Sequence, residues 1–213
     1  MGCRLQREHW GGIFAAHPWL EGPQDSYLGY WKRGGGASGE HSHAIHLWQF
    51  FAHAAGAGRV VEVQATLNYV NDGTVDYDQL CLLQLRTENS LTGRVVQDVV
   101  THPPRKWARA QGDLGFAEWH CGKPAGADSV RLGTGDQTSE QVIEKIRPDD
   151  FIQELRHLEM MMKGDKCVGS PLTLERGLET MMVLAAAHRS QQQRRTIHID
   201  YTVGWSPTAL KEQ

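Results

Sequence analysis

Residues 61–69 alternate between apolar and polar side chains, and this pattern constrains the fold more than any other feature of the chain. Such alternation is typical of a β-strand that is buried on one face only. The run leads into Asn71-Asp72-Gly73, which favours a tight hairpin turn. Four more strand-like runs follow, at 75–87, 91–101, 106–111 and 114–119. Five strands in this order predict an antiparallel sheet.

Helical periodicity marks three other segments. The first is about 37–55, the second follows Arg147-Pro148 and continues to residue 162, and the third begins after Pro171. Thr196–Tyr201 has the pattern of a short closing strand, whereas residues 122–147 give mixed signals and receive no assignment. We therefore predict an α+β fold, an open and mainly antiparallel sheet with helices packed on one face. Residues 1–36, rich in Gly, Pro and aromatic residues, are expected to form an extended lead-in to one domain at 37–213.

The composition excludes several classes of protein. The 213 residues carry 22 Lys and Arg against 25 Asp and Glu, so there is no basic excess to bind nucleic acid. No apolar run is long enough for a membrane span or a signal peptide, which predicts a cytoplasmic protein. The four cysteines form no C-x-x-C pair, which favours reduced thiols. They are Cys3, Cys81, Cys121 and Cys167, of which Cys81 and Cys121 are expected to be buried in strands.

Phosphate-binding signatures are missing from the sequence. The glycine run Gly34-Gly35-Gly36 follows no apolar strand and has neither the G-x-G-x-x-G nor the Walker A spacing. The G-x-S-x-G and H-E-x-x-H motifs are absent as well. We therefore predict no cofactor-binding residues in this chain.

A cluster of histidines follows the glycine run. His41, His43, His46 and His53 fall within a short stretch, and Glu40 lies three residues before His43. On a helix His43, His46 and His53 share one face. Imidazole and carboxylate together suit proton transfer near neutral pH. Two alternatives remain: a metal site at His41, His43 and His46, or ordinary surface and core histidines.

Three stretches resemble the C-terminal domain of the Gfo/Idh/MocA oxidoreductases. The glycine run with His43-Ala44-Ile45-His46-Leu47 is similar to the family's glycine-rich segment and H-x-x-D helix. Residues 111–119 resemble its G-x-x-G hairpin that ends in an acidic residue and Trp, and residues 175–190 resemble its last helix. The stretches occur in the family's order and cover roughly residues 30–205.

The resemblance implies a substrate domain whose partner, an NAD(P)-binding Rossmann domain, is not expected in this chain. It places the family's catalytic histidine on His43, with Glu40 as the companion acid and with His41 or His46 helping to orient the histidine. Two departures from the family pattern stand out: Gly39 lies where the family has its acid, and His46 replaces an Asp. They indicate a shifted acid, a relocated one, or lost activity.

Aromatic and cationic residues just before the glycine run are candidates for sugar contacts. Tyr30, Trp31 and Lys32 could stack on and hydrogen-bond a sugar, although loop packing explains them equally well. We therefore expect the substrate-binding and oligomerisation portion of an NAD(P)-dependent sugar or polyol oxidoreductase, inactive alone. A separate nucleotide-binding subunit or a truncated gene product would account for the missing half. Apolar side chains on both faces of the sheet, such as Leu82 and Leu83, predict a homo-oligomer. The alternative is a non-catalytic binding or assembly protein derived from that family.

Overall fold

The computed structural model describes residues 18–146, 148–164 and 169–212. The chain divides into two compact units, one formed by Met1–Thr101 with Pro171–Gln213 and the other by His102–Ser170. The strand-like runs predict one sheet, but the strands form two, one in each unit. The α+β fold class is confirmed. The predicted boundary at residue 36 is a different division of the chain and stays a prediction.

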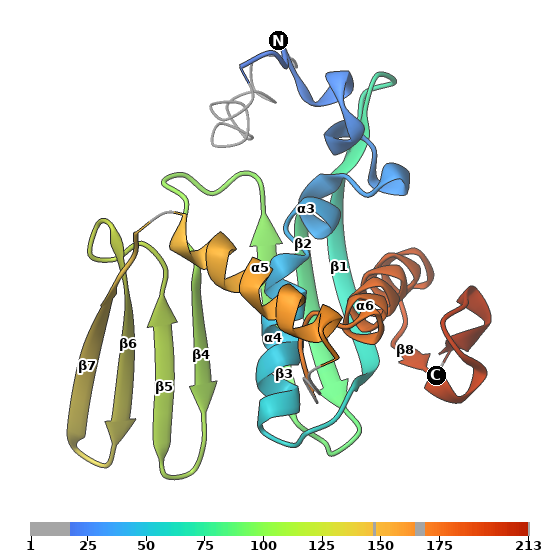
Figure 1. Ribbon diagram of the computed structural model, residues 1–213. Helices are drawn as coiled ribbons and strands as arrows, with labels where there is room; N and C mark the ends of the chain where they lie inside the picture. Colours follow the sequence, from blue (N-terminus) through green and yellow to red (C-terminus); the bar gives the residue numbers. More distant parts are fainter. Residues whose placement is uncertain (1–17, 147, 165–168, 213) are drawn as a thin grey trace. The chain divides into compact units, whose positions relative to one another are not determined.

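The first unit contains a five-stranded antiparallel sheet (Figure 1). Its strands are β1 (Val60–Asn71), β2 (Asp76–Thr87), β3 (Thr92–Asp98), β8 (Ile197–Ile199) and β9 (Leu210–Glu212), in the order β3-β2-β1-β8-β9. The hairpin between β1 and β2 forms at the predicted Asn-Asp-Gly sequence. There the carboxylate of Asp72 accepts hydrogen bonds from the amides of Thr74 and Val75. The alternation at 61–69 and the turn residues therefore set this part of the fold.

Three helices of the first unit, α3 (Gly36–Glu40), α4 (His43–Ala54) and α6 (Leu174–Gln193), pack on one face of this sheet. Inward-facing side chains of β1 and β2 form a core with α6, in which Val63, Leu83 and Val183 are nearly inaccessible to solvent. On the opposite face, Leu82 and Val96 are 36% and 56% exposed. One face of the sheet is thus covered and the other is open.

The single helix expected over about 37–55 is broken between α3 and α4. The last turn of α3 closes with the amide of His41 donating to the carbonyl of Ala37, and α4 begins at His43. Helix α4 ends in a Schellman motif, in which Ala57 N–H donates to the carbonyl of Ala52 and the left-handed Gly56 donates to that of His53. The histidine cluster therefore lies across a helix junction.

The second unit contains a four-stranded antiparallel meander and one helix. Its strands are β4 (Trp107–Gln111), β5 (Gly115–His120), β6 (Ala127–Thr134) and β7 (Gln137–Glu144), and α5 spans Asp149–Met162. Strands β6 and β7 account for most of the segment that sequence patterns leave unassigned. The helix forms where predicted, but its apolar stripe is not buried within this unit.

The described part of the lead-in, residues 18–36, is folded into three 3-10 turns instead of an extended segment. The turns are η1 (Pro23–Asp25), η2 (Tyr27–Gly29) and η3 (Trp31–Arg33). Leu28 is buried in a small core with Val75 and Tyr77, and Tyr30 forms a parallel bridge with Asp76. Two more 3-10 turns, η4 (Tyr201–Val203) and η5 (Pro207–Ala209), lie between β8 and β9.

The cysteines agree with the sequence analysis in part. Cys81 is buried in β2, and its burial raises the pKa of the thiol. Cys121 is not buried in a strand as expected; it follows β5 in a turn and is half-buried. Cys3 and Cys167 lie outside the described residues. None of the helices described here has the length and apolar character needed to cross a membrane.

Candidate functional site

The three predicted substrate-binding residues of the lead-in lie together at turn η3. The indole Nε1 of Trp31 donates to Oδ2 of Asp76 at 3.1 Å, and the hydroxyl of Tyr30 donates to the carbonyl of Thr74 at 3.1 Å. The ammonium of Lys32 lies 5.4 Å from the centre of the Trp31 ring. The β1–β2 hairpin therefore fixes both aromatic side chains by their polar atoms, and Lys32 makes a cation–π contact with one of them.

Glu40, the predicted companion acid, is bound by the same lead-in. The hydroxyl of Tyr27 donates to Oε2 of Glu40 at 2.6 Å. This hydrogen bond, helped by partial burial, raises the pKa of Tyr27 to about 12. Glu40 is the last residue of α3, and the half-buried His41 follows it directly. The carboxylate thus lies near the aromatic residues through Tyr27.

His43, His46 and His53 form no hydrogen bonds with one another in the described part of the chain. His43 is exposed and His46 half-buried in the first turn of α4, and within the described ranges neither makes a hydrogen bond to Glu40. His53, further along the same helix, binds the buried carboxylate of Glu179 at 2.6 Å. Among the residues that the structure describes, no three His, Cys, Asp or Glu side chains are grouped to hold a metal ion. The metal alternative therefore gains no support.

Gly39 lies at a position where no side chain fits. A Cβ atom built on Gly39 would be 2.1 Å from the carbonyl oxygen of Gly34. The close approach of these two backbone segments requires glycine there. The fold therefore leaves no room for an acidic side chain at residue 39, and Glu40 is the nearest acid in the sequence.

A buried carboxylate that the sequence analysis does not single out lies beneath the glycine run. Asp78 is inaccessible to solvent, and Ser38 donates to it twice, from its amide to Oδ2 at 2.7 Å and from its hydroxyl to Oδ1 at 2.8 Å. Gln97 donates in turn to the carbonyl of Ser38 at 3.0 Å. Burial raises the pKa of Asp78, and the hydrogen bonds from Ser38 oppose that rise.

His188 of α6 continues this network. Its Nε2 lies 3.1 Å from the hydroxyl oxygen of Ser38, and its Nδ1 lies 2.6 Å from that of Tyr69. The imidazole also stacks on Trp31, with ring centres 4.4 Å apart and planes inclined by 17°. Burial lowers the pKa of His188 to about 4, so the ring is neutral at pH 7. Trp31 and the buried carboxylate of Asp78 are therefore connected through one histidine.

Sequence patterns could not find this network for a local reason. A register shift in the pairing of β1 with β2 at Asn68 and Tyr69 disturbs the alternation, so Tyr77 and Asp78 are both buried. His188 lies about 110 residues further on, among alanines of a helix. The one available signal is an imidazole on the apolar face of that helix, and such a residue is usually part of the core.

The glycine run lies against the buried carboxylate of Asp78. Gly36 has a φ of +80°, and a Cβ atom there would lie 2.1 Å from Oδ1 of Asp78. The space beside this glycine is thus filled by a carboxylate, which repels phosphate. The run instead allows α3 to approach β2 closely.

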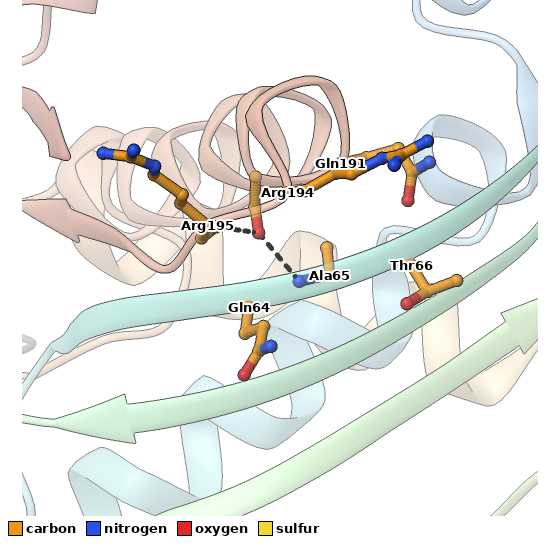
Figure 2. Close-up of a pocket in the computed structure, with 7 residues that line it drawn as sticks. Gln64, Ala65, Thr66, Gln191, Arg194 and Arg195 are labelled. Carbon is orange, nitrogen blue, oxygen red and sulfur yellow. Dashed lines mark hydrogen bonds between the residues drawn. The ribbon is translucent and has the colours of Figure 1, made fainter. Parts of the chain in front are cut away.

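A separate polar pocket of about 280 Å³ lies between β1 and the end of α6 (Figure 2). The hydroxyl of Ser190 donates to the carbonyl of Arg195 at 2.6 Å and accepts from the amide of Ala65 at 3.0 Å. Gln191 Oε1 accepts from the amide of Leu67 at 2.9 Å. In Figure 2 the side chains of Arg194 and Arg195 run in opposite directions. These groups complete the edge of β1, and they do not converge on a ligand position.

No protein-family model and no curated protein matches the sequence. Solved structures do match. The aldose-aldose oxidoreductase from Caulobacter crescentus, complexed with glycerol, is 15% identical, with a TM-score of 0.66, and the match covers 93% of this chain and 63% of that one. The WlbA dehydrogenase from Bordetella pertussis, in complex with NADH and UDP-GlcNAcA, is 19% identical, with a TM-score of 0.58 over 83% of this chain and 53% of that one.

A 3-ketoreductase from Actinomadura kijaniata, in complex with TDP-benzene and NADP, is 17% identical, with a TM-score of 0.57 over 74% of this chain and 48% of that one. The chain has the fold of these oxidoreductases. They are of the Gfo/Idh/MocA type, so the resemblance seen in the sequence motifs is confirmed for the fold. The chain spans between 47% and 63% of the length of such neighbours, consistent with the C-terminal domain that the motifs resemble.

Proposed function

We propose that this chain is the substrate-binding and oligomerisation portion of an NAD(P)-dependent sugar or polyol oxidoreductase. The observation that carries the proposal is the fold shared over 93% of the chain with an aldose-aldose oxidoreductase complexed with glycerol. Within that fold, the hydrogen bond from Tyr27 to Glu40 joins the aromatic lead-in to the end of α3, three residues before His43. This arrangement supports binding of a molecule rich in hydroxyl groups.

His43 is the proposed acid/base. Its imidazole is exposed at the start of α4 and makes no hydrogen bond to another described residue, so it can accept a proton from a substrate hydroxyl. Trp31 offers an apolar ring, and Lys32 and Glu40 offer charged groups for other hydroxyls. The nicotinamide would supply the hydride acceptor. We propose that it comes from a nucleotide-binding partner or segment, because the glycine run of this chain does not fit its phosphates.

Substitution of His43 tests the binding role. Glycerol and a panel of aldohexoses are expected to bind the purified chain, as detected by saturation-transfer NMR and titrated by calorimetry. The H43A variant should bind about fivefold more weakly, since it loses a hydrogen bond to the ligand of roughly 1 kcal/mol. H102A, which removes an exposed histidine of the second unit, is the matched control and should bind like the parent chain.

The same titration with NAD(H) and NADP(H) is expected to give no binding by the chain alone. Equal affinity of the parent chain and H43A for every sugar would contradict the acid/base role. Turnover that H43A abolishes in a mixture reconstituted with a nucleotide-binding subunit would separate an enzyme portion from a non-catalytic assembly protein. The latter is favoured by one observation, the replacement of two family acids by Gly39 and His46.

The open face of the five-stranded sheet is the proposed contact between copies of the chain. Leu82 is paired with Thr66 on one side and with Val96 on the other, and all three point away from the helices. A Leu82→Asp variant places a charge at the centre of this row, so it is expected to reduce the mass measured by light scattering to that of a monomer. Gln192→Asp, on the exposed face of α6, should leave the mass unchanged. A parent chain that is already monomeric at high concentration would overturn this part of the proposal.

A further inference from the structure

The hydrogen bonds around Asp78 have a defined direction. The single hydroxyl proton of Ser38 goes to Oδ1 of Asp78, so the hydroxyl oxygen of Ser38 can only accept from His188. A neutral imidazole carries one N–H, and here it must be on Nε2. Nδ1 then accepts the hydroxyl proton of Tyr69. The four groups thus form one chain in which every donor points toward Asp78.

We propose that these four side chains form a proton relay from Tyr69 to Asp78. A ligand hydroxyl or a buffer acid beside Tyr69 is the proton donor, and the buried carboxylate is the acceptor. This inference rests on the proposed function only for the identity of the ligand as a hydroxyl compound. The relay is distinct from His43, which lies on α4 and makes no hydrogen bond to it within the described residues.

Transfer along the relay balances in protons and charge. The donor protonates the oxygen of Tyr69, whose own proton passes to Nδ1 of His188. The proton on Nε2 passes to the oxygen of Ser38, and the serine proton passes to Oδ1 of Asp78. Four bonds to hydrogen break and four form, and no group is oxidised or reduced. The donor ends deprotonated, Asp78 ends protonated, and His188 ends as the other neutral tautomer.

The surroundings favour this route over a charged intermediate. Burial lowers the pKa of His188 to about 4, so the ring passes a proton instead of keeping one. Burial raises the pKa of Asp78, which makes it a better base. The other titratable groups that interact with the relay are Asp76 and Cys81 on β2. The negative charge of Asp76 disfavours a second anion at Tyr69, whereas the buried Cys81 is a neutral thiol.

Tyr69, the outer end of the relay, lies beside Trp31. Tyr69 is half-buried, and its ring centre lies 5.9 Å from that of Trp31. Trp31 also stacks on His188 and is fixed by Asp76. A hydroxyl compound that packs against Trp31 would therefore bring its oxygen close to the tyrosine hydroxyl.

Nitrogen NMR of the full chain tests the relay, with ¹⁵N-labelled histidine and ¹³C-labelled aspartate. At pH 7.5 the proton of His188 is expected on Nε2. As the pH falls, the Asp78 carboxyl should take up a proton, and His188 should change to the Nδ1–H tautomer with the same midpoint. In S38A the carboxyl still titrates but the tautomer change is lost. S42A, a neighbouring serine whose side chain makes no capping bond, should behave like the parent chain.

Three results would overturn the relay: a proton on Nδ1 at every pH, a tautomer change with a midpoint different from that of Asp78, or coupling that persists in S38A. If S38A does not fold, the two midpoints of the parent chain decide. Glycerol and aldohexose binding is measured on the same samples. Coupling without sugar binding would overturn the proposed function alone, and sugar binding without coupling would overturn the relay alone.

Discussion

Replacing Gly36 by alanine is expected to lower the free energy of unfolding by roughly 3 kcal/mol. Two effects add up. The residue has a φ of +80°, which costs an alanine about 1 kcal/mol, and its Cβ atom would lie 2.1 Å from Oδ1 of Asp78. The carboxylate must then move, and its two hydrogen bonds from Ser38 are disturbed in a fully buried place. Urea denaturation of both proteins measures the difference.

Gly56→Ala is the matched control for this substitution. Gly56 also has a positive φ, of +70°, but nothing lies within 4 Å of the place where its Cβ atom would be. It should therefore cost only the backbone strain of about 1 kcal/mol. Equal losses of unfolding free energy in the two variants would show that the Asp78 carboxylate moves at no energetic cost. The close packing of α3 on β2 would then contribute little to stability.

Acidification is expected to destabilise the protein through His188. The unfolded chain takes up a proton there near the ordinary pKa of 6.5, whereas the folded protein does so only near 4, because the ring is buried. Between these values the unfolded state binds more protons, so stability falls as the pH falls. The full effect of this histidine is about 3 kcal/mol, present above pH 6.5 and lost by about pH 4.

Asp78 acts in the opposite sense over part of this window, since its raised pKa lets the folded protein take up a proton first. The contribution of His188 is therefore measured as a difference between proteins. Urea unfolding at pH 7, 5.5 and 4.5 should give a flatter pH dependence for His188→Gln than for the parent chain. His102→Gln, at an exposed histidine, should follow the parent chain. Parallel curves for the parent chain and His188→Gln would disprove the buried, neutral state of the ring.

Local patterns predicted those parts of the fold that local chemistry determines. The alternation at 61–69 and the Asn71-Asp72-Gly73 turn gave β1, β2 and their hairpin, because one face of a half-buried strand must be apolar. The division into two sheets was not predictable in this way. The strand runs before and after Thr101 have similar patterns, and which strands pair is decided by contacts distant in sequence.

The predicted site residues that the structure brings together are close neighbours in the sequence, and their roles stay predictions. Trp31 and Lys32 do lie together, and Glu40 is tied to the lead-in. The bond between Ser38 and His188 joins residues 150 apart, so no motif spacing could indicate it. Gly36 also illustrates the limit: the sequence shows a flexible residue, and only the fold reveals that a carboxylate occupies the space beside it.

The edge of β1 that faces β8 is only partly paired, and this affects how copies of this protein can associate. Strand β8 pairs with β1 only at Glu62 and Val63, and beyond them α6 side chains bind the amides of Ala65 and Leu67. This stretch of edge cannot recruit a strand from a neighbouring molecule, since its donors are already used. In the described part of the first unit, β3 and β9 are the outer strands, and their outer edges can still pair with a strand of another molecule. Protection against edge-to-edge aggregation is thus provided at β1 by a helix.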